Sequence, residues 1–370
     1  MNKHHLYWIG FNLVKGIGPV RFRALLDSFE NAEVAWKASP KELRESGLNE
    51  KLIENIVTLR SNVSLDLVWE RICRLGISVL TWEDEGYPDR LRDIPQSPPI
   101  LYVKGELAPE DDWSIAIVGT RRITAYGRQV TEKIAARMAQ AGVTIVSGLA
   151  RGIDGVAHKA ALDSGGRTIA VLGSGVDQIY PPEHRKLAMK IIEKGALVSD
   201  YPPGTKPEAS NFPPRNRIIS GLSMGTVIVE AGRRSGALIT ADFAAEQGKD
   251  VFAVPGNIFS PQSQGTNKLI RDGARVLVNP QEILETLDLT RINELNEARI
   301  ILPTDPTEAE LFSILSHEPL HVDEIRNLTE LSIETVTATL TMMELKGMVR
   351  QIGGMRYTAI KEIGPEYQVD

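Results

Sequence analysis

The sequence has a single cysteine, Cys73, among 370 residues, so no disulfide can form within the chain. We therefore predict a location in the reducing cytoplasm. No apolar run approaches the ~20 residues that a membrane-spanning helix needs, and we expect no membrane association. Positive charge is not in excess, because 48 acidic residues outnumber 42 basic ones. If the chain binds a polyanion, its basic residues must be gathered on one face.

Several cofactor and catalytic signatures are also missing. The sequence contains no Walker A motif, and Gly119 begins a run that lacks the second and third glycines of the dinucleotide fingerprint. The six histidines are scattered, one cysteine cannot build a zinc site, and no Gly-x-Ser-x-Gly elbow occurs. We interpret His158 as a structural helix residue. These absences predict no cofactor, no metal and no enzymatic activity of these classes.

The sequence patterns at the two ends of the chain each predict a small, mainly helical domain. Residues 1–75 are expected to form helices around the glycine turn Gly16–Gly18, which is typical of helix-hairpin-helix (SAM-like) domains. Residues 305–370 start with an Asp-Pro helix signal and end in two strand-like segments around a Gly-Gly turn, which predicts a winged helix. Acidic residues outnumber basic ones in this region, so we expect a protein-contact or regulatory role rather than DNA reading.

The central region, residues 112–286, alternates short apolar runs with amphipathic helical patterns. It is preceded by a proline-rich connector at 76–111 and followed by a polar linker at 287–304. Continuous rather than alternating hydrophobicity is typical of strands buried on both faces. The alternation therefore predicts an α/β domain with a doubly wound, Rossmann-like parallel sheet. The expected strands are residues 114–118, 143–146, 168–172, 196–198, 226–229 and 250–254.

The segment 211–223 combines an aromatic residue, two prolines and basic residues at a predicted helix start. Proline suits the first turn of a helix, and the N-terminal N–H groups of a helix favour an anion. Arg215, Asn216 and Arg217 would lie at this anion-favouring end, and Phe212 offers a face on which a base could stack. The pattern predicts contact with single-stranded nucleic acid. The alternative is that the arginines are ion-paired or surface residues and that the phenylalanine belongs to the core.

Glycines follow five of the six predicted strands, and several of these loops carry arginine. The carboxyl ends of parallel strands share one edge of the sheet, where ligands bind. Glycine lets backbone N–H groups approach phosphate oxygens closely. The basic patch expected at this edge includes Arg121, Arg122, Arg151, Lys206, Arg215, Arg217, Arg233, Arg234 and Lys249.

The central region resembles the DprA (Smf) family of bacterial DNA processing proteins. The segments that carry the resemblance are residues 119–122, 147–158, 211–220, 235–240, 251–256 and 269–274. They occur in order across the whole central domain. The predicted N-terminal helical domain and the C-terminal winged helix also resemble longer members of the family.

The resemblance implies a binding protein rather than an enzyme. Such proteins bind single-stranded DNA entering the cell in natural transformation, protect it, and help load the recombinase RecA for recombination; they act as homodimers. The residues implied for DNA binding are Gly119, Arg121, Arg122, Thr124, Lys206, Phe212, Arg215, Asn216, Arg217, Gly232, Ser235 and Lys249. Those implied for the dimer interface are Asn267, Ile270 and Val276.

A nucleotide-cleaving phosphoribohydrolase on the same type of sheet is the alternative. Such enzymes place a Pro-Gly-Gly-x-Gly-Thr loop and a glutamate near the equivalent strand end. Here the loop reads Glu-Ala-Gly-Arg-Arg-Ser-Gly from Glu230, without the double glycine or the threonine. Glu230 could take the place of the glutamate, but the loop sequence favours DNA binding.

Overall fold

The chain divides into two compact units, residues 1–290 and 291–370. The computed structural model describes residues 4–289, 305–315, 319–329, 331–345 and 348–359. None of the helices in these ranges is long and apolar enough to cross a bilayer.

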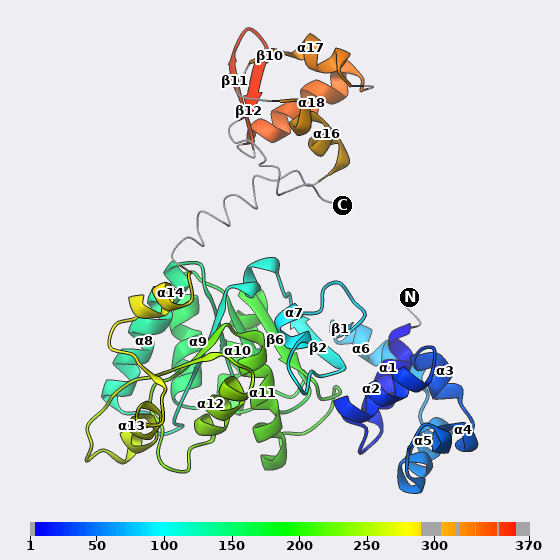
Figure 1. Cartoon of the computed structure of the whole chain (residues 1–370), viewed down its shortest axis with the longest axis vertical. Helices are drawn as coiled ribbons and strands as arrows, with labels where there is room; N and C mark the ends of the chain where they lie inside the picture. Colours follow the sequence, from blue (N-terminus) through cyan, green and yellow to red (C-terminus); the bar gives the residue numbers. More distant parts are fainter. Residues whose placement is uncertain (1–3, 290–304, 316–318, 330, 346–347, 360–370) are drawn as a thin grey trace. The chain divides into compact units, whose positions relative to one another are not determined.

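The first unit is built on a nine-stranded sheet in the order β1-β2-β6-β5-β4-β3-β7-β8-β9 (Figure 1). The strands are β1 Ser78–Thr81, β2 Ile100–Gly105, β3 Ser114–Val118, β4 Thr144–Ser147, β5 Thr168–Val171, β6 Gly195–Ser199, β7 Gly225–Ile228, β8 Asp250–Ala253 and β9 Arg275–Val276. All pairs from β6 to β9 in this order are parallel. Each of the six runs predicted as buried strands forms one of these strands, which confirms the α/β class.

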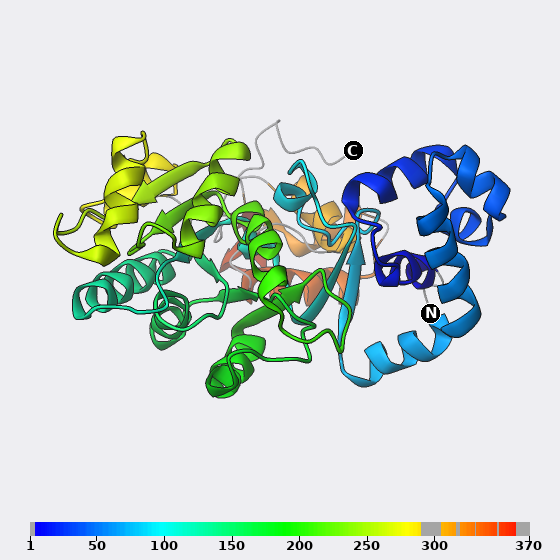
Figure 2. The ribbon, with the colours of Figure 1, turned by 90° about the horizontal axis from the view of Figure 1, so that it is seen from below.

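Helices cover both faces of the sheet because each buried strand has apolar residues on both sides. Ile169 and Val171 of β5 share a core with Ile218 of α11, whereas Ala170 shares another with Ile191 of α10. Figures 1 and 2 show α8, α9 and α10 on one face and α11 and α12 on the other. The helices are α8 Ala125–Gln140, α9 Ile153–Asp163, α10 Arg185–Lys194, α11 Phe212–Leu222, α12 Gly236–Glu246, α13 Gln264–Arg271 and α14 Gln281–Thr286.

The predicted connector, residues 76–111, differs from the expectation. It contains α7 Asp89–Arg92 and the 3₁₀ turn η1 Pro109–Asp112, and its β1 and β2 extend the sheet. Strand β2 pairs antiparallel with β6 and is buried over most of its length. Its pairing partner lies almost a hundred residues further along the chain, so the local proline-rich sequence gave no sign of this pairing.

The N-terminal helices pack onto the sheet rather than forming a separate core. Trp8 and Phe22 stack edge-on with ring centroids 4.8 Å apart, and both belong to a buried cluster that also contains Tyr102 of β2. The hydroxyl of Tyr102 donates to the Asn12 side chain at 3.0 Å. Gly16 adopts the positive φ of +99° that the predicted glycine turn requires. These helices are α1 His4–Leu13, α2 Pro19–Ser28, α3 Ala32–Lys37, α4 Pro40–Glu45, α5 Glu50–Asn62 and α6 Leu65–Arg74.

The second unit has its own apolar core and forms the predicted winged helix. Asp305 caps α16 by accepting from the backbone N–H groups of Thr307 and Glu308. A three-stranded sheet in the order β10-β12-β11 turns back at the Gly353-Gly354 pair. Its elements are α16 Pro306–Ile314, β10 Leu320–His321, α17 Val322–Asn327, α18 Ile333–Leu345, β11 Val349–Gly353 and β12 Arg356–Ala359. Most of the predicted linker, 290–304, lies outside the described residues.

Candidate nucleic-acid interface

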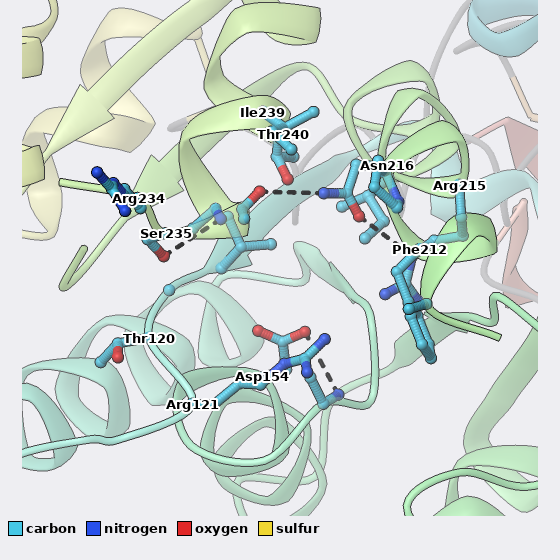
Figure 3. Close-up of a pocket in the computed structure, with 18 of the residues that line it drawn as sticks. Thr120, Arg121, Asp154, Phe212, Arg215, Asn216, Arg234, Ser235, Ile239 and Thr240 are labelled. Atoms are coloured by element: carbon cyan, nitrogen blue, oxygen red, sulfur yellow. Dashed lines mark hydrogen bonds between the residues drawn. The ribbon is translucent and has the colours of Figure 1, made fainter. Parts of the chain in front are cut away.

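The main candidate site is a pocket of about 720 Å³ at the carboxyl edge of the sheet. Neighbouring β3 and β7 lead to helices on opposite faces there, and open α/β sheets bind ligands at such a switch point. Figure 3 shows Arg234 and Ser235 on one side of the pocket and Phe212 and Arg215 on the other. Of the predicted DNA-binding residues, the pocket is lined by Gly119, Arg121, Phe212, Arg215, Asn216, Gly232 and Ser235.

Phe212 provides a half-buried aromatic surface at the start of α11. Its ring lies 5.9 Å from that of Tyr180, centroid to centroid, and the guanidinium carbon of Arg121 lies 5.5 Å from its centroid. A Cβ atom at Gly173 would come within 2.8 Å of the phenyl ring, so glycine after β5 makes room for it. The arrangement places a cation and a stacking surface side by side.

Five basic side chains around the pocket are exposed and form no ion pair among the described residues. They are Arg121, Arg122, Lys206, Arg233 and Arg234. Arg121 and Arg234 line the pocket itself. Such uncompensated charges favour a polyanion despite the net charge of −6 of the whole chain.

Arg215 lines the pocket, but its side chain is buried and binds other parts of the protein. This differs from the exposed anion contact that the sequence predicts. It is 4% exposed, and its guanidinium donates to the carbonyls of Gly148 and Val171 and to the Asn216 side chain. Burial lowers the pKa of Arg215 to about 10, while the carboxylate of Asp154 favours its charged form. The residue ties α11 to the end of β5 and to the loop after β4, and its guanidinium carbon lies 5.8 Å from the centroid of the Phe212 ring.

Two other predicted DNA contacts lie away from the pocket. Arg217 is 5% exposed, forms an ion pair with Asp200 at 2.8 Å and donates to the carbonyl of Gln96. Lys249 immediately precedes β8, at the amino edge, and its ammonium donates to the carbonyls of Ser220 and Gly221. Lys249 therefore stabilises the C-terminal end of α11, and Arg217 joins the middle of this helix to Asp200 and Gln96. Both side chains make internal contacts rather than facing the pocket.

Thr124 and Glu230 fix the loop that carries Arg121. The buried carboxylate of Glu230 accepts from the hydroxyl of Thr124 at 2.5 Å and from its N–H at 3.1 Å. The same hydroxyl caps α8 by accepting from the N–H of Gly127. A Cβ at Gly127 would lie 2.2 Å from this carboxylate. Glu230 thus has a structural task, which weakens the phosphoribohydrolase alternative that rests on it.

Local hydrogen bonds also fix the start of α12 and join this helix to α11 at the pocket. The hydroxyl of Ser235 caps α12 by accepting from the N–H of Ala237 at 3.3 Å. The Asn216 amide donates to the carbonyl of Gly236 at 3.2 Å and so joins α11 to α12. Gly232 lies in the loop between β7 and this cap.

Asp154 and Tyr180 line the pocket, and the sequence did not assign them a role. Asp154 is 5% exposed at the start of α9, where it accepts from the backbone N–H groups of Gly148 and Ala150. The signal in the sequence that could have pointed to Asp154 was an acidic residue at a predicted helix start, directly after the glycine-rich end of a strand. Tyr180 lies in the long loop after β5, and no local pattern distinguishes it.

His158 is buried and has two hydrogen-bond partners, as interpreted from the sequence. Its Nδ1 lies 2.7 Å from the hydroxyl of Thr168, and its Nε2 accepts from the N–H of Leu149 at 3.3 Å. The threonine hydroxyl donates to the carbonyl of Ile145, so Nδ1 carries the proton and the imidazole is neutral. Burial lowers the pKa of His158 to about 3. Within the described ranges, no cluster of three or more His, Cys, Asp or Glu side chains is placed to hold a metal ion.

The three predicted dimer residues lie around the β9 edge of the sheet. Val276 is 46% exposed on β9, and Ile270 is half-buried on α13. Asn267 instead makes reciprocal hydrogen bonds with the backbone N–H and carbonyl of Gly256, at 3.1 and 2.9 Å. Asn267 therefore fastens α13 to the loop after β8.

Two family models and several known proteins match the chain. Residues 78–288 match the DNA recombination-mediator protein A model, and residues 296–355 match the DprA winged helix domain. Protein Smf of Synechocystis sp. is 38% identical over 96% of this chain and 99% of its own length.

Two solved structures of relatives share the fold. The DNA processing protein A (DprA) structure from Streptococcus pneumoniae is 33% identical, with a TM-score of 0.68 over 76% of this chain and 97% of that one. The structure of DNA processing protein A from Helicobacter pylori, described for its single-stranded DNA binding mode, is 33% identical, with a TM-score of 0.52 over 57% and 95% of the two chains. The family model, the full-length relative and the shared architecture agree, and the chain belongs to the DprA (Smf) family.

Proposed function

We propose that the carboxyl-edge pocket binds single-stranded DNA without sequence preference and without catalysing a reaction. The observation that carries the proposal is the Arg121 guanidinium beside the half-buried ring of Phe212, in a pocket whose other exposed cation, Arg234, has no ion-pair partner among the described residues. Single-stranded DNA binders combine a cationic groove with aromatic rings on which bases stack, and every base offers a π-face. The Helicobacter pylori relative, whose structure is described for its single-stranded DNA binding mode, supports single-stranded DNA as the ligand.

We further propose the cellular role that the family resemblance implies. In this role the chain acts in the cytoplasm, protects DNA taken up in transformation, and helps load RecA onto it. The proposed active form is a homodimer that uses the β9 edge, where Val276 is exposed.

Arg121→Ala is expected to weaken binding of oligothymidylate several-fold and to make the log–log salt slope less negative by about 0.7, because one phosphate contact is lost. The measurement is fluorescence anisotropy of the full chain at several salt concentrations, with blunt duplex as the competing ligand. Arg74→Ala, which removes an exposed arginine from the end of α6, is the matched control. Equal affinity of the unaltered protein for duplex and single strands would contradict the pocket assignment.

Phe212→Ala is expected to cost about 1–3 kcal/mol of binding free energy, while the salt slope stays nearly unchanged, because stacking involves no counterion release. Phe212→Tyr keeps a ring and should retain most of the affinity. Thermal melting of both variants separates this role from packing. A Phe212→Ala protein that melts much earlier, yet binds normally when folded, would assign the ring to the core.

A further inference from the structure

A second cavity, of about 470 Å³, lies on the α8–α9–α10 face of the sheet. We call it the α9 cleft. Its lining residues are Ile123, Arg128, Gly152, Gly155, Val156, Lys159, Leu162, Asp163, Glu183, His184, Lys186, Leu187 and Lys190. They follow α9 from its start to its end, a length of about 16 Å for its 11 residues.

The charges in the α9 cleft leave basic residues without partners. Its acid Asp163 forms an ion pair with Lys159, and its other acid, Glu183, is paired with Arg151; both N···O distances are 2.5 Å. Among the described residues, the three remaining basic side chains form no ion pair, and all are exposed. They are Arg128 of α8 and Lys186 and Lys190 of α10. The cleft is therefore suited to an anion that runs along it.

Outside the lining, Glu132 of α8 acts electrostatically on Lys159. The floor between the basic residues is largely apolar or glycine, with Val156 and Leu187 contributing side chains. At Gly155 a Cβ atom would lie 2.6 Å from the His184 ring, so glycine lets this ring pack closely against α9. Apolar residues between basic ones suit single-stranded DNA, which combines charged phosphates with flat, apolar bases.

The α9 cleft lies next to the pocket at the carboxyl edge. A small hollow shares Arg121, Tyr180 and Phe212 with the pocket and also includes Arg151. Arg151 in turn holds Glu183 of the cleft. Gly152, which lines the cleft, packs against the backbone of Thr120 and Arg121, which line the pocket. The two sites are therefore neighbours, and a strand seated on the phenyl ring would have the cleft beside it.

We propose that the α9 cleft holds the phosphodiester backbone of the single strand that leaves the pocket, so that the DNA path turns from the carboxyl edge onto the α9 face. This inference rests on the proposed function. It assigns Arg128, Lys186 and Lys190 to phosphate contacts, none of which the sequence singled out.

The test is the double variant Lys186→Ala/Lys190→Ala of the full chain, measured with oligothymidylates of about six and about 20 nucleotides. Affinity for the longer strand should fall on the order of tenfold at low salt, and its salt slope should become less negative by about 1.4 for the two lost contacts. Affinity for the shorter strand, which fills only the pocket, should not change. The control Lys133→Ala/Lys194→Ala removes equal charge from α8 and α10 outside the cleft.

The outcomes separate the two proposals. If the unaltered protein binds neither strand, the proposed function fails, and the cleft assignment fails with it. If it binds both strands and the cleft variant matches the control variant, only the cleft assignment is overturned. Equal loss for short and long strands in a folded variant would also overturn it, because the lysines would then act on the pocket itself.

Discussion

Replacing Arg215 with methionine is expected to lower the free energy of unfolding by about 3–5 kcal/mol, because several buried acceptors lose their donor at a cost of about 1–3 kcal/mol each. The change leaves the carbonyls of Gly148 and Val171 without this donor and removes a positive charge that favours the ionised form of the buried Asp154. Arg215→Lys should recover only part of this loss, because an ammonium cannot span the same acceptors as a planar guanidinium.

Urea unfolding followed by tryptophan fluorescence measures this effect, because all five tryptophans lie in the first unit. The matched control is Arg121→Met, an exposed position where the change should stay within about 0.5 kcal/mol. Comparing the two variants also separates stability from DNA binding, because Arg121→Met is expected to weaken DNA binding without changing the free energy of unfolding. An Arg215→Met protein as stable as the unaltered one, but defective in binding, would return Arg215 to the role of a phosphate contact.

The stability of the first unit is expected to depend on pH through His158. Its pKa is about 3 in the folded protein and about 6.5 in an unfolded chain. Below pH 6.5 the unfolded state therefore binds a proton that the folded state excludes, and stability is lost progressively as pH falls towards 3. At about 1.4 kcal/mol per pH unit, the contribution of this one group reaches about 5 kcal/mol.

The matched variant His158→Gln isolates this contribution from that of the carboxylates. The variant should be less stable than the unaltered protein at pH 7.5, because it loses the geometry of the bonds to Leu149 and Thr168. The difference between the two proteins should then shrink as the pH falls from 6.5 to 4. A difference that stays constant over this range would show that the imidazole does not titrate on unfolding.

The sheet could be predicted from the sequence because its central strands are continuous apolar runs, such as 143–146 and 226–229, separated by helical patterns. The location of the pocket could be predicted as well, because the carboxyl ends of parallel strands lie at the same edge of the sheet. The antiparallel strands β1 and β2 could not be predicted in the same way. Their place depends on β6, a partner that the local sequence does not specify.

The direction of individual arginine side chains was the hardest feature to predict. Arg121 and Arg215 both follow a glycine- or proline-rich turn, yet one is exposed and the other is 4% exposed. The difference arises from carbonyl groups at Gly148 and Val171, which come from other strand ends. A basic residue close to a helix start is therefore ambiguous until the surrounding backbone acceptors are known.

The N-terminal helices share one buried cluster with the sheet, and this has a consequence for shortened forms of the protein. Trp8 and Phe11 cover the same apolar region that Tyr102 and Leu197 contribute from the sheet. A protein beginning near residue 76 would present that region to water as one contiguous patch, and such patches promote self-association and aggregation. The helical segment thus acts as a solubilising cover for the domain that carries the pocket, whatever other contacts it makes.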